Sequence, residues 1–396
     1  MAGPGTPTFY ILALGPPGSG KTVYLAMLHR VISTRFLGPG VGFAIDDNGD
    51  RAWLQAAYKK IIDTRIPQFS DKTPGADIRE ITLRCQIGRP ASTGRFGRRI
   101  RGQQHTAFLI NYTDYAGERL TRANTYAVPG IADDFQRKLE QAHAMLGIID
   151  GEQLLRYLND PVGNRDYFLD NVWPIVATMR GHTVPCQFVV TKWDLLAGHT
   201  PEEIEALLRS ASDQTGYRLL MDERSAERRA AGEAGRIRVI PVSSVGEFAQ
   251  LTAEGMRKVP DRDPTPVNVE VPLIAALVDV CDMAGKILGE QRRRQREGAR
   301  RPREPGGDES EESSTGTVAV GAFGVKVNLA TIVAFTRGTG TVLGRPAFSV
   351  GRLLRREYHR VASHGLSGVR SEEGALFYAG RELGRQLAAY EDRVGG

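Results

Sequence analysis

The chain has 396 residues, of which 41% are hydrophobic and 25% charged, and it carries a formal net charge of +6. This balance is typical of a globular protein long enough for more than one domain. Three widely separated cysteines exclude a disulfide scaffold and suggest a reducing, cytoplasmic setting. The sequence contains no uncharged apolar run of 18 residues, so we expect no membrane-spanning helix.

From Phe9 to about Gln291, strand-like apolar runs alternate with helical patterns. This alternation predicts an α/β fold, with a mostly parallel sheet and helices on both faces. The connection after the second strand has no helical pattern, so Ile78–Ile87 is predicted to be the one antiparallel strand. The predicted strands are Phe9–Leu14, Ile78–Ile87, Ala107–Thr113, Ala144–Asp150, Cys186–Thr191 and Arg236–Val242. The predicted helices are Thr22–Phe36, Asp50–Thr64, Asp133–Gln141, Asn164–Met179, Pro201–Ser210 and Pro272–Gln291.

Composition divides the chain into three parts. The main domain is predicted over 8–291. Residues 292–316 join a basic block to an acidic, serine-rich run with almost nothing to bury, which predicts a disordered linker. Residues 317–396 form a small C-terminal region of unknown role, with a helical pattern at Ser371–Asp392. The arginine clusters at Arg89–Arg101 and Arg292–Arg303 lack interleaved aromatic residues, so nucleic-acid binding is not expected.

A phosphate-binding loop, G-P-P-G-S-G-K-T, stands between the first strand and the first helix. Its glycines let backbone N–H groups surround a phosphate at the helix N-terminus. Lys21 is expected to reach the β- and γ-phosphates and Thr22 to ligate Mg²⁺. The residues predicted to hold the nucleotide here are Gly15, Pro17, Gly18, Ser19, Gly20, Lys21, Thr22 and Val23.

A second motif, D-x-x-G, follows the strand Ala107–Thr113 and is formed by Asp114 and Gly117. With the phosphate loop, it resembles the Ras-like and translation-factor (TRAFAC) class of P-loop GTPases. The resemblance implies that Asp114 holds Mg²⁺ through water and that Gly117 contacts the γ-phosphate. Glu118 stands where the family often has the glutamine that positions the attacking water, so we expect slow hydrolysis without a partner. Lys21, Gly117 and Glu118 are the predicted catalytic residues.

Two later motifs extend this resemblance to the base. T-K-x-D places Thr191, Lys192 and Asp194 after the fifth predicted strand, close to the family's N-K-x-D. A carboxylate there accepts two hydrogen bonds from guanine, and adenine would leave it unpaired. Thr191 replaces an asparagine whose amide joins the base loop to the phosphate loop, so weaker affinity is expected. After the next strand, S-S-V-G resembles the family's S-A-K loop, in which a backbone N–H binds the guanine oxygen. The base-loop residues predicted there are Ser243, Ser244 and Val245.

The first switch is the least defined part of the resemblance. Thr73 is predicted to be its Mg²⁺-sensing threonine, with Thr64 as the alternative. The motifs are widely spaced, and the extra sequence lies at Asp50–Thr64 and Gly88–Gln104. Because loops beside switches bind partners, we expect an effector or regulatory protein to bind these insertions. Glycine and arginine richness is associated with a GC-rich bacterial source, and the oligomeric state stays open.

The favoured function is a guanine-nucleotide switch that binds GTP or GDP and Mg²⁺, hydrolyses GTP to GDP and phosphate, and regulates a protein partner. One alternative is an ATPase of the AAA type, which needs two adjacent carboxylates after a strand. The nearest candidates, Asp150 and Glu152, are separated by a glycine. The other alternative is a nucleotide-binding adaptor with little hydrolysis, for which Glu118 is the argument.

Overall fold

A computed structural model describes residues 6–35, 37–69, 79–89, 92–93, 99–100, 103–116, 131–231, 237–280, 317–320, 325–328 and 359–394. The predicted linker 292–316 and the segments 321–324 and 329–358 of the region after it lie outside these residues, as do Thr73, Gly117 and Glu118. None of the described helices has the length and apolar content needed to cross a membrane.

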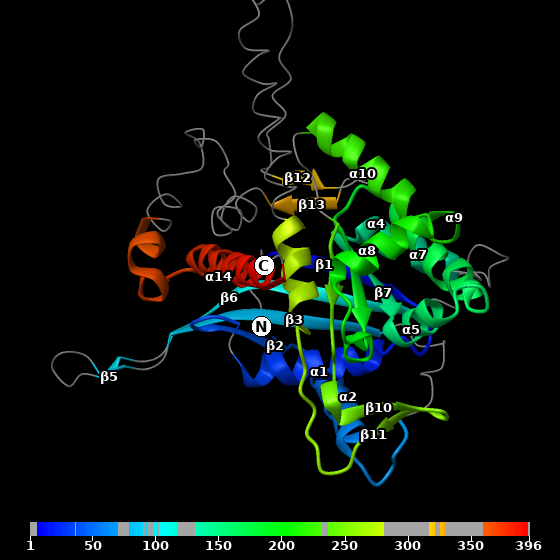
Figure 1. Cartoon of the computed structure of the whole chain (residues 1–396). Coiled ribbons are helices and arrows are strands. Elements are labelled where there is room, and N and C mark those ends of the chain that lie inside the picture. Colours follow the sequence, from blue (N-terminus) through cyan, green and yellow to red (C-terminus); the bar gives the residue numbers. More distant parts are fainter. Residues whose placement is uncertain are drawn as a thin grey trace, which may run out of the picture.

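A seven-stranded sheet forms the centre of the fold, in the order β2-β3-β6-β1-β7-β8-β9 (Figure 1). Only β3 runs against its two neighbours, β2 and β6, which confirms the predicted antiparallel strand; the remaining pairs are parallel. The strands are β1 (Thr8–Gly15), β2 (Val41–Ile45), β3 (Arg79–Arg89), β6 (Gln103–Ala116), β7 (Ala144–Asp150), β8 (Cys186–Thr191) and β9 (Val239–Pro241).

Helices cover both faces of the sheet, which confirms the predicted three-layer α/β fold of a P-loop NTPase. Residues of β1 alternate between the faces: Phe9 and Ile11 point into one core, Leu12 and Leu14 into the other. The first core contains α1 (Lys21–Thr34), the helix at 271–280 and α14 (Glu372–Val394). The second contains α4 (Ile131–Gln141), α5 (Gly151–Asn159), α7 (Trp173–Arg180), α8 (Pro201–Ser210) and α10 (Tyr217–Ala231).

The predicted helix Asn164–Met179 is interrupted. It comprises α6 (Arg165–Tyr167), a π-helical turn at Phe168–Val172 and then α7. The Trp173 N–H bonds back to the carbonyl of Phe168, five residues earlier. Pro174, which follows at the start of α7, has no N–H to donate, so the wider turn occurs where the regular hydrogen-bond ladder is already broken.

A smaller unit lies beside α1. It combines α2 (Asn48–Ile62) with the antiparallel hairpin of β10 (Ala249–Thr252) and β11 (Gly255–Lys258), and Figure 1 shows the two side by side. The ammonium of Lys258 donates to the carbonyls of Lys60 (2.6 Å) and Asp63 (2.9 Å) and so closes the end of α2. The added helix predicted at Asp50–Thr64 is therefore an ordered part of the described structure.

The C-terminal helix α14 packs on the main sheet, where it contacts β3 and β6. The hydroxyl of Tyr378 donates to the carbonyl of Pro39 at 2.8 Å. Near the other end of the helix, Glu391 accepts from Arg238, which also pairs with the buried Asp279 at 2.6 Å. Helix α14 thus shares its core with β1, the strand that precedes the phosphate loop.

The remaining described elements are short. They are β4 (Ser92–Thr93), β5 (Arg99–Ile100), α9 (Ser212–Thr215), β12 (Thr317–Val320), β13 (Val325–Asn328), a helix at 359–364, and 3₁₀ turns at Trp193–Leu196, Gly246–Phe248 and Gly365–Gly368.

Candidate functional site

The phosphate loop connects β1 to α1 as the motif requires. Gly18 and Gly20 have positive φ angles of 78° and 81°, which residues with a side chain rarely adopt. At Gly15, a Cβ atom would lie 2.7 Å from Cβ of Ile148 on β7. Gly18 and Gly20 therefore permit the turn of the backbone, and Gly15 permits the close packing of β1 on β7.

Side chains of the loop point inward. The ammonium of Lys21 donates to the carbonyls of Gly15 (2.7 Å) and Pro16 (2.9 Å). Ser19 is fully buried, and its hydroxyl also donates to Pro16, at 2.8 Å. The cation therefore lies inside the loop, directly before the N-terminus of α1, where an anion would be stabilised.

Asp114 lies on β6, next to the phosphate loop. Its backbone pairs with Ala13 of β1, two residues before the loop begins. One oxygen of its carboxylate, Oδ1, is shielded from solvent and has no hydrogen-bond partner among the described residues. Burial raises the pKa of Asp114, and the nearby Lys21 ammonium acts in the opposite direction. An orphaned, shielded carboxylate oxygen beside the loop is the donor that a hard cation such as Mg²⁺ prefers.

Thr191 joins the T-K-x-D segment to the phosphate loop. It is buried at the end of β8, and its hydroxyl donates to the carbonyl of Ser19 at 2.7 Å, with Ile149 O a second acceptor at 3.2 Å. The sequence led us to expect that this link is lost with the family's asparagine. That expectation is wrong for the described structure, because a hydroxyl on this short side chain reaches the Ser19 carbonyl directly.

Asp194 lies in the 3₁₀ turn after Thr191, at the carboxyl end of β8. Its Oδ1 accepts a hydrogen bond from the hydroxyl of Ser243, which in turn accepts one from the Gly246 N–H at 2.9 Å. The T-K-x-D and S-S-V-G segments, 49 residues apart at this contact, thus meet at one edge of the sheet. Such an edge, outside the carboxyl ends of parallel strands, is where open α/β sheets bind ligands.

Lys192 is held by two carboxylates that sequence reasoning assigned to another role. It has a positive φ of 51°, and its ammonium lies 2.9 Å from Asp150 Oδ2 and 3.0 Å from Glu152 Oε2. Burial raises the pKa of Asp150, with Lys192 opposing. At Glu152, burial also favours the neutral acid, but Lys192 and Arg156 outweigh it and the pKa is lowered. Asp150 also accepts from the Glu152 N–H at 2.9 Å and caps α5.

Three other predicted residues lie near the S-S-V-G loop. Ser244 and Val245 are buried there, and Val23 on α1 packs against the cluster that contains Val245. The backbone of that loop is fixed by pairing of Ser243 with Val267. Thr64 lies two residues after the end of α2, whereas Thr73, Gly117 and Glu118 fall outside the described residues. Among those residues, no group of three or more histidine, cysteine or acidic side chains forms a metal cluster.

Comparison with known proteins gives distant structural similarities. No protein-family model and no curated protein matches the sequence. Among solved structures, the chain is similar to the signal recognition particle receptor SRb-GTP/SRX complex from Chaetomium thermophilum, at 14% identity and a TM-score of 0.26, over 61% of this chain and 92% of that one. It is also similar to the bacterial selenocysteine-specific elongation factor EF-Sec, at 10% identity and a TM-score of 0.23, over 60% of this chain and 25% of that one.

A further similarity is to a GDP-bound mutant of the FeoB G-domain from S. thermophilus, at 12% identity and a TM-score of 0.28, over 97% of this chain and 90% of that one. Because all three TM-scores are below 0.5, the fold assignment depends on the strand order and on the phosphate loop between β1 and α1.

Proposed function

We propose that this protein is a guanine-nucleotide-binding switch that uses Mg²⁺ and hydrolyses GTP to GDP and phosphate. The observation that carries the proposal is the hydrogen bond from Thr191 to Ser19, because it joins the loop suited to a purine to the loop suited to phosphates. A nucleotide that spans both loops can bind its base in one and its phosphates in the other, whereas either loop alone would bind only part of it.

Base choice follows from Asp194. Ser243 donates to Oδ1 of this half-buried carboxylate and so orients it at the rim of the sheet. The N1–H and the exocyclic amine of guanine are two donors that such a carboxylate can accept together. Adenine offers an acceptor at the first position and would leave the carboxylate without these two hydrogen bonds, at a cost of about 1–3 kcal/mol or more.

The residues present fit a bound Mg²⁺. Asp114 Oδ1 is the shielded oxygen without a partner, and Thr22 follows Lys21 at the start of α1. Asp114 would hold the ion through water and Thr22 through its hydroxyl, while Lys21 would exchange its loop carbonyls for phosphate oxygens. The ion, when bound, neutralises charge on the phosphate oxygens during in-line attack by water. Gly117, Glu118 and Thr73 would act as proposed from the sequence, with Glu118 making unassisted hydrolysis slow.

An ATPase of the AAA type is less well supported. Its second carboxylate would have to polarise a water molecule beside the phosphates. Both available carboxylates, Asp150 and Glu152, are instead paired with the ammonium of Lys192 in the proposed base loop.

Titration calorimetry with GTP, GDP and ATP tests base choice. We expect guanine nucleotides to bind at least about tenfold more tightly than ATP, the effect of about 1.4 kcal/mol. Asp194→Asn should move the preference from guanine toward xanthine nucleotides, because the amide donates to the oxygen that replaces the guanine amine. Asp222→Asn, at an exposed carboxylate on α10, is the matched control and should change nothing. Tighter binding of ATP than of GTP refutes the proposal.

Single-turnover hydrolysis separates a switch from an adaptor. The wild-type protein should hydrolyse GTP slowly and Glu118→Gln faster, because glutamine can both accept from water and donate to the γ-phosphate. Binding without hydrolysis in both proteins would leave the adaptor as the better description. A pull-down with GTP-bound and GDP-bound protein tests whether a partner reads the insertions at Asp50–Thr64 and Gly88–Gln104.

A further inference from the structure

The sheet ends at β9, far from the phosphate loop in strand order. In the described part of the structure, β9 pairs only with β8. The carbonyl of Arg238 accepts from Phe188, and the N–H of Val242 donates to Val190, both at 2.8 Å, so these two residues face β8. Because backbone groups alternate sides along a strand, Val239 and Ile237 direct theirs toward the open edge.

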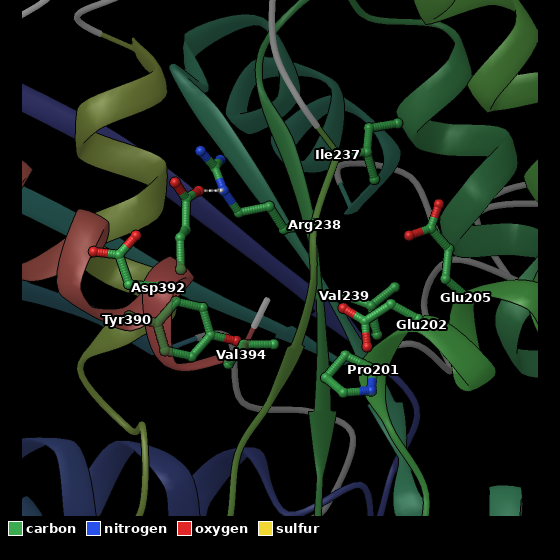
Figure 2. A pocket seen from close by; sticks show the side chains of 10 residues that line it. Pro201, Glu202, Glu205, Ile237, Arg238, Val239, Tyr390, Asp392 and Val394 are labelled. Carbon is green, nitrogen blue, oxygen red and sulfur yellow. Dashed lines mark hydrogen bonds and ion pairs between the residues drawn. The ribbon is translucent and has the colours of Figure 1, made fainter. Parts of the chain in front are cut away.

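A pocket of about 460 Å³ opens along this edge (Figure 2). Its walls are the start of α8, the strand around Val239 and the end of α14. The volume is in the range of pockets that hold one side chain or a small ligand. The lining residues are Pro201, Glu202, Glu205, Ile237, Arg238, Val239, Tyr390, Glu391, Asp392 and Val394.

The pocket is strongly acidic. Four carboxylates and one guanidinium line it. Glu205 pairs with Arg209, and Glu391 pairs with Arg238. Glu202 and Asp392 are exposed and have no ion-pair partner in the part of the chain that the structure describes. Arg238 contributes little free positive charge, since it is also paired with the buried Asp279.

Tyr390 provides a second, independent sign that the pocket receives a ligand. The residue is only 4% exposed, yet its hydroxyl makes no hydrogen bond to any described residue. Figure 2 shows the ring between the end of α14 and Pro201, with its oxygen toward the side of Glu202. Burial, followed by the negative charge of Glu202, raises the pKa of Tyr390 to about 12. The ring is buried while the hydroxyl reaches the accessible surface of the pocket, where it offers a donor and an acceptor to a ligand.

We propose that this pocket binds an extended basic segment of a partner protein. The segment adds a strand along the open edge of β9 and places a lysine or arginine side chain among Glu202, Asp392 and the Tyr390 hydroxyl. Unpaired backbone groups supply the affinity of strand addition, and the carboxylates select a cationic side chain. An acidic segment would be disfavoured, because it would place like charge beside the exposed carboxylates of Glu202 and Asp392.

Fluorescence anisotropy with a labelled peptide of alternating arginine and valine tests the proposal on the full chain. We expect saturable binding that weakens with salt. Glu202→Gln combined with Asp392→Asn should weaken it about tenfold. Asp213→Asn combined with Asp222→Asn removes the same charge from exposed sites on α9 and α10 and should leave it unchanged. A peptide with alternate backbone nitrogens methylated should also bind about tenfold more weakly, because it cannot pair with a strand.

Each opposite result overturns the proposal. Equal binding to both double variants would mean attraction to net charge alone, and equal binding of the methylated peptide would exclude strand pairing. The peptide could also bind only after the arginines of 292–303 are replaced by glutamine. That result would identify this chain's own basic stretch as the occupant of the pocket. Guanine-nucleotide affinity should be the same in all variants, so this test is independent of the proposed function.

Discussion

Replacing Thr191 by valine removes one hydroxyl between the two halves of the proposed nucleotide site. The hydroxyl lies 2.7 Å from the carbonyl of Ser19, and both residues are buried, so no water can take its place without rearrangement. A buried acceptor that loses its donor costs about 1–3 kcal/mol, and the added methyl group recovers about 0.8 kcal/mol. With about 2 kcal/mol as the middle of that range, the net loss is about 1.2 kcal/mol, or about eightfold in an equilibrium constant.

The loss should fall on ligands that need both loops at once. In Thr191→Val, titration calorimetry should show GTP binding weakened about eightfold. Guanosine and pyrophosphate, each of which needs one loop, should bind within about twofold of wild type, a difference below about 0.5 kcal/mol. Thr191→Ser keeps the hydroxyl and is the control. The reasoning is refuted if Thr191→Val binds GTP normally, or if pyrophosphate loses as much affinity as GTP.

Three further predictions concern stability. Burial lowers the pKa of His143 from 6.5 to about 4. The neutral imidazole therefore contributes fully to the free energy of unfolding above pH 6.5, and this contribution is lost as the pH falls toward 4. In urea unfolding, the free energy of unfolding of His143→Asn should fall by about 3 kcal/mol less than that of wild type across this pH range. Gly20→Ala should destabilise the protein by about 1–2 kcal/mol, because its φ of 81° is unfavourable with a side chain although space is available; an unchanged unfolding midpoint would contradict this. Arg238→Met should cost about 3–5 kcal/mol by leaving Asp279 buried without its cation, and adding Asp279→Leu should restore most of it.

Several elements could not be predicted from local patterns. β2 has only five residues, too few for a clear alternation. α5 begins directly after β7, and its capping residue Asp150 was interpreted as part of an acidic pair. The break in Asn164–Met179 is marked by Pro174. The apolar periodicity of the segment nevertheless favours one continuous helix, so the break is not predicted. These are short or interrupted segments, for which periodicity is weakest.

The candidate site divides in the same way. The phosphate loop was predictable because its function depends on consecutive residues: glycines that permit positive φ angles, then a lysine and a threonine at the start of a helix. Asp114 was also predictable, since it ends an apolar strand. The partners of Lys192 were not, because Asp150 and Glu152 lie 42 and 40 residues earlier and become neighbours only when β7 pairs with β8.

The sequence by itself therefore determined the phosphate loop, the α/β class and the antiparallel β3, all of which depend on residues close together in the chain. The tertiary structure decided that the Thr191 hydroxyl links the two loops, that Lys192 pairs with both candidate ATPase carboxylates, and that α14 shares the central core. It also created the acidic pocket at β9. These features depend on which strands become neighbours, and strand order is set by the packing of the whole core rather than by any local pattern.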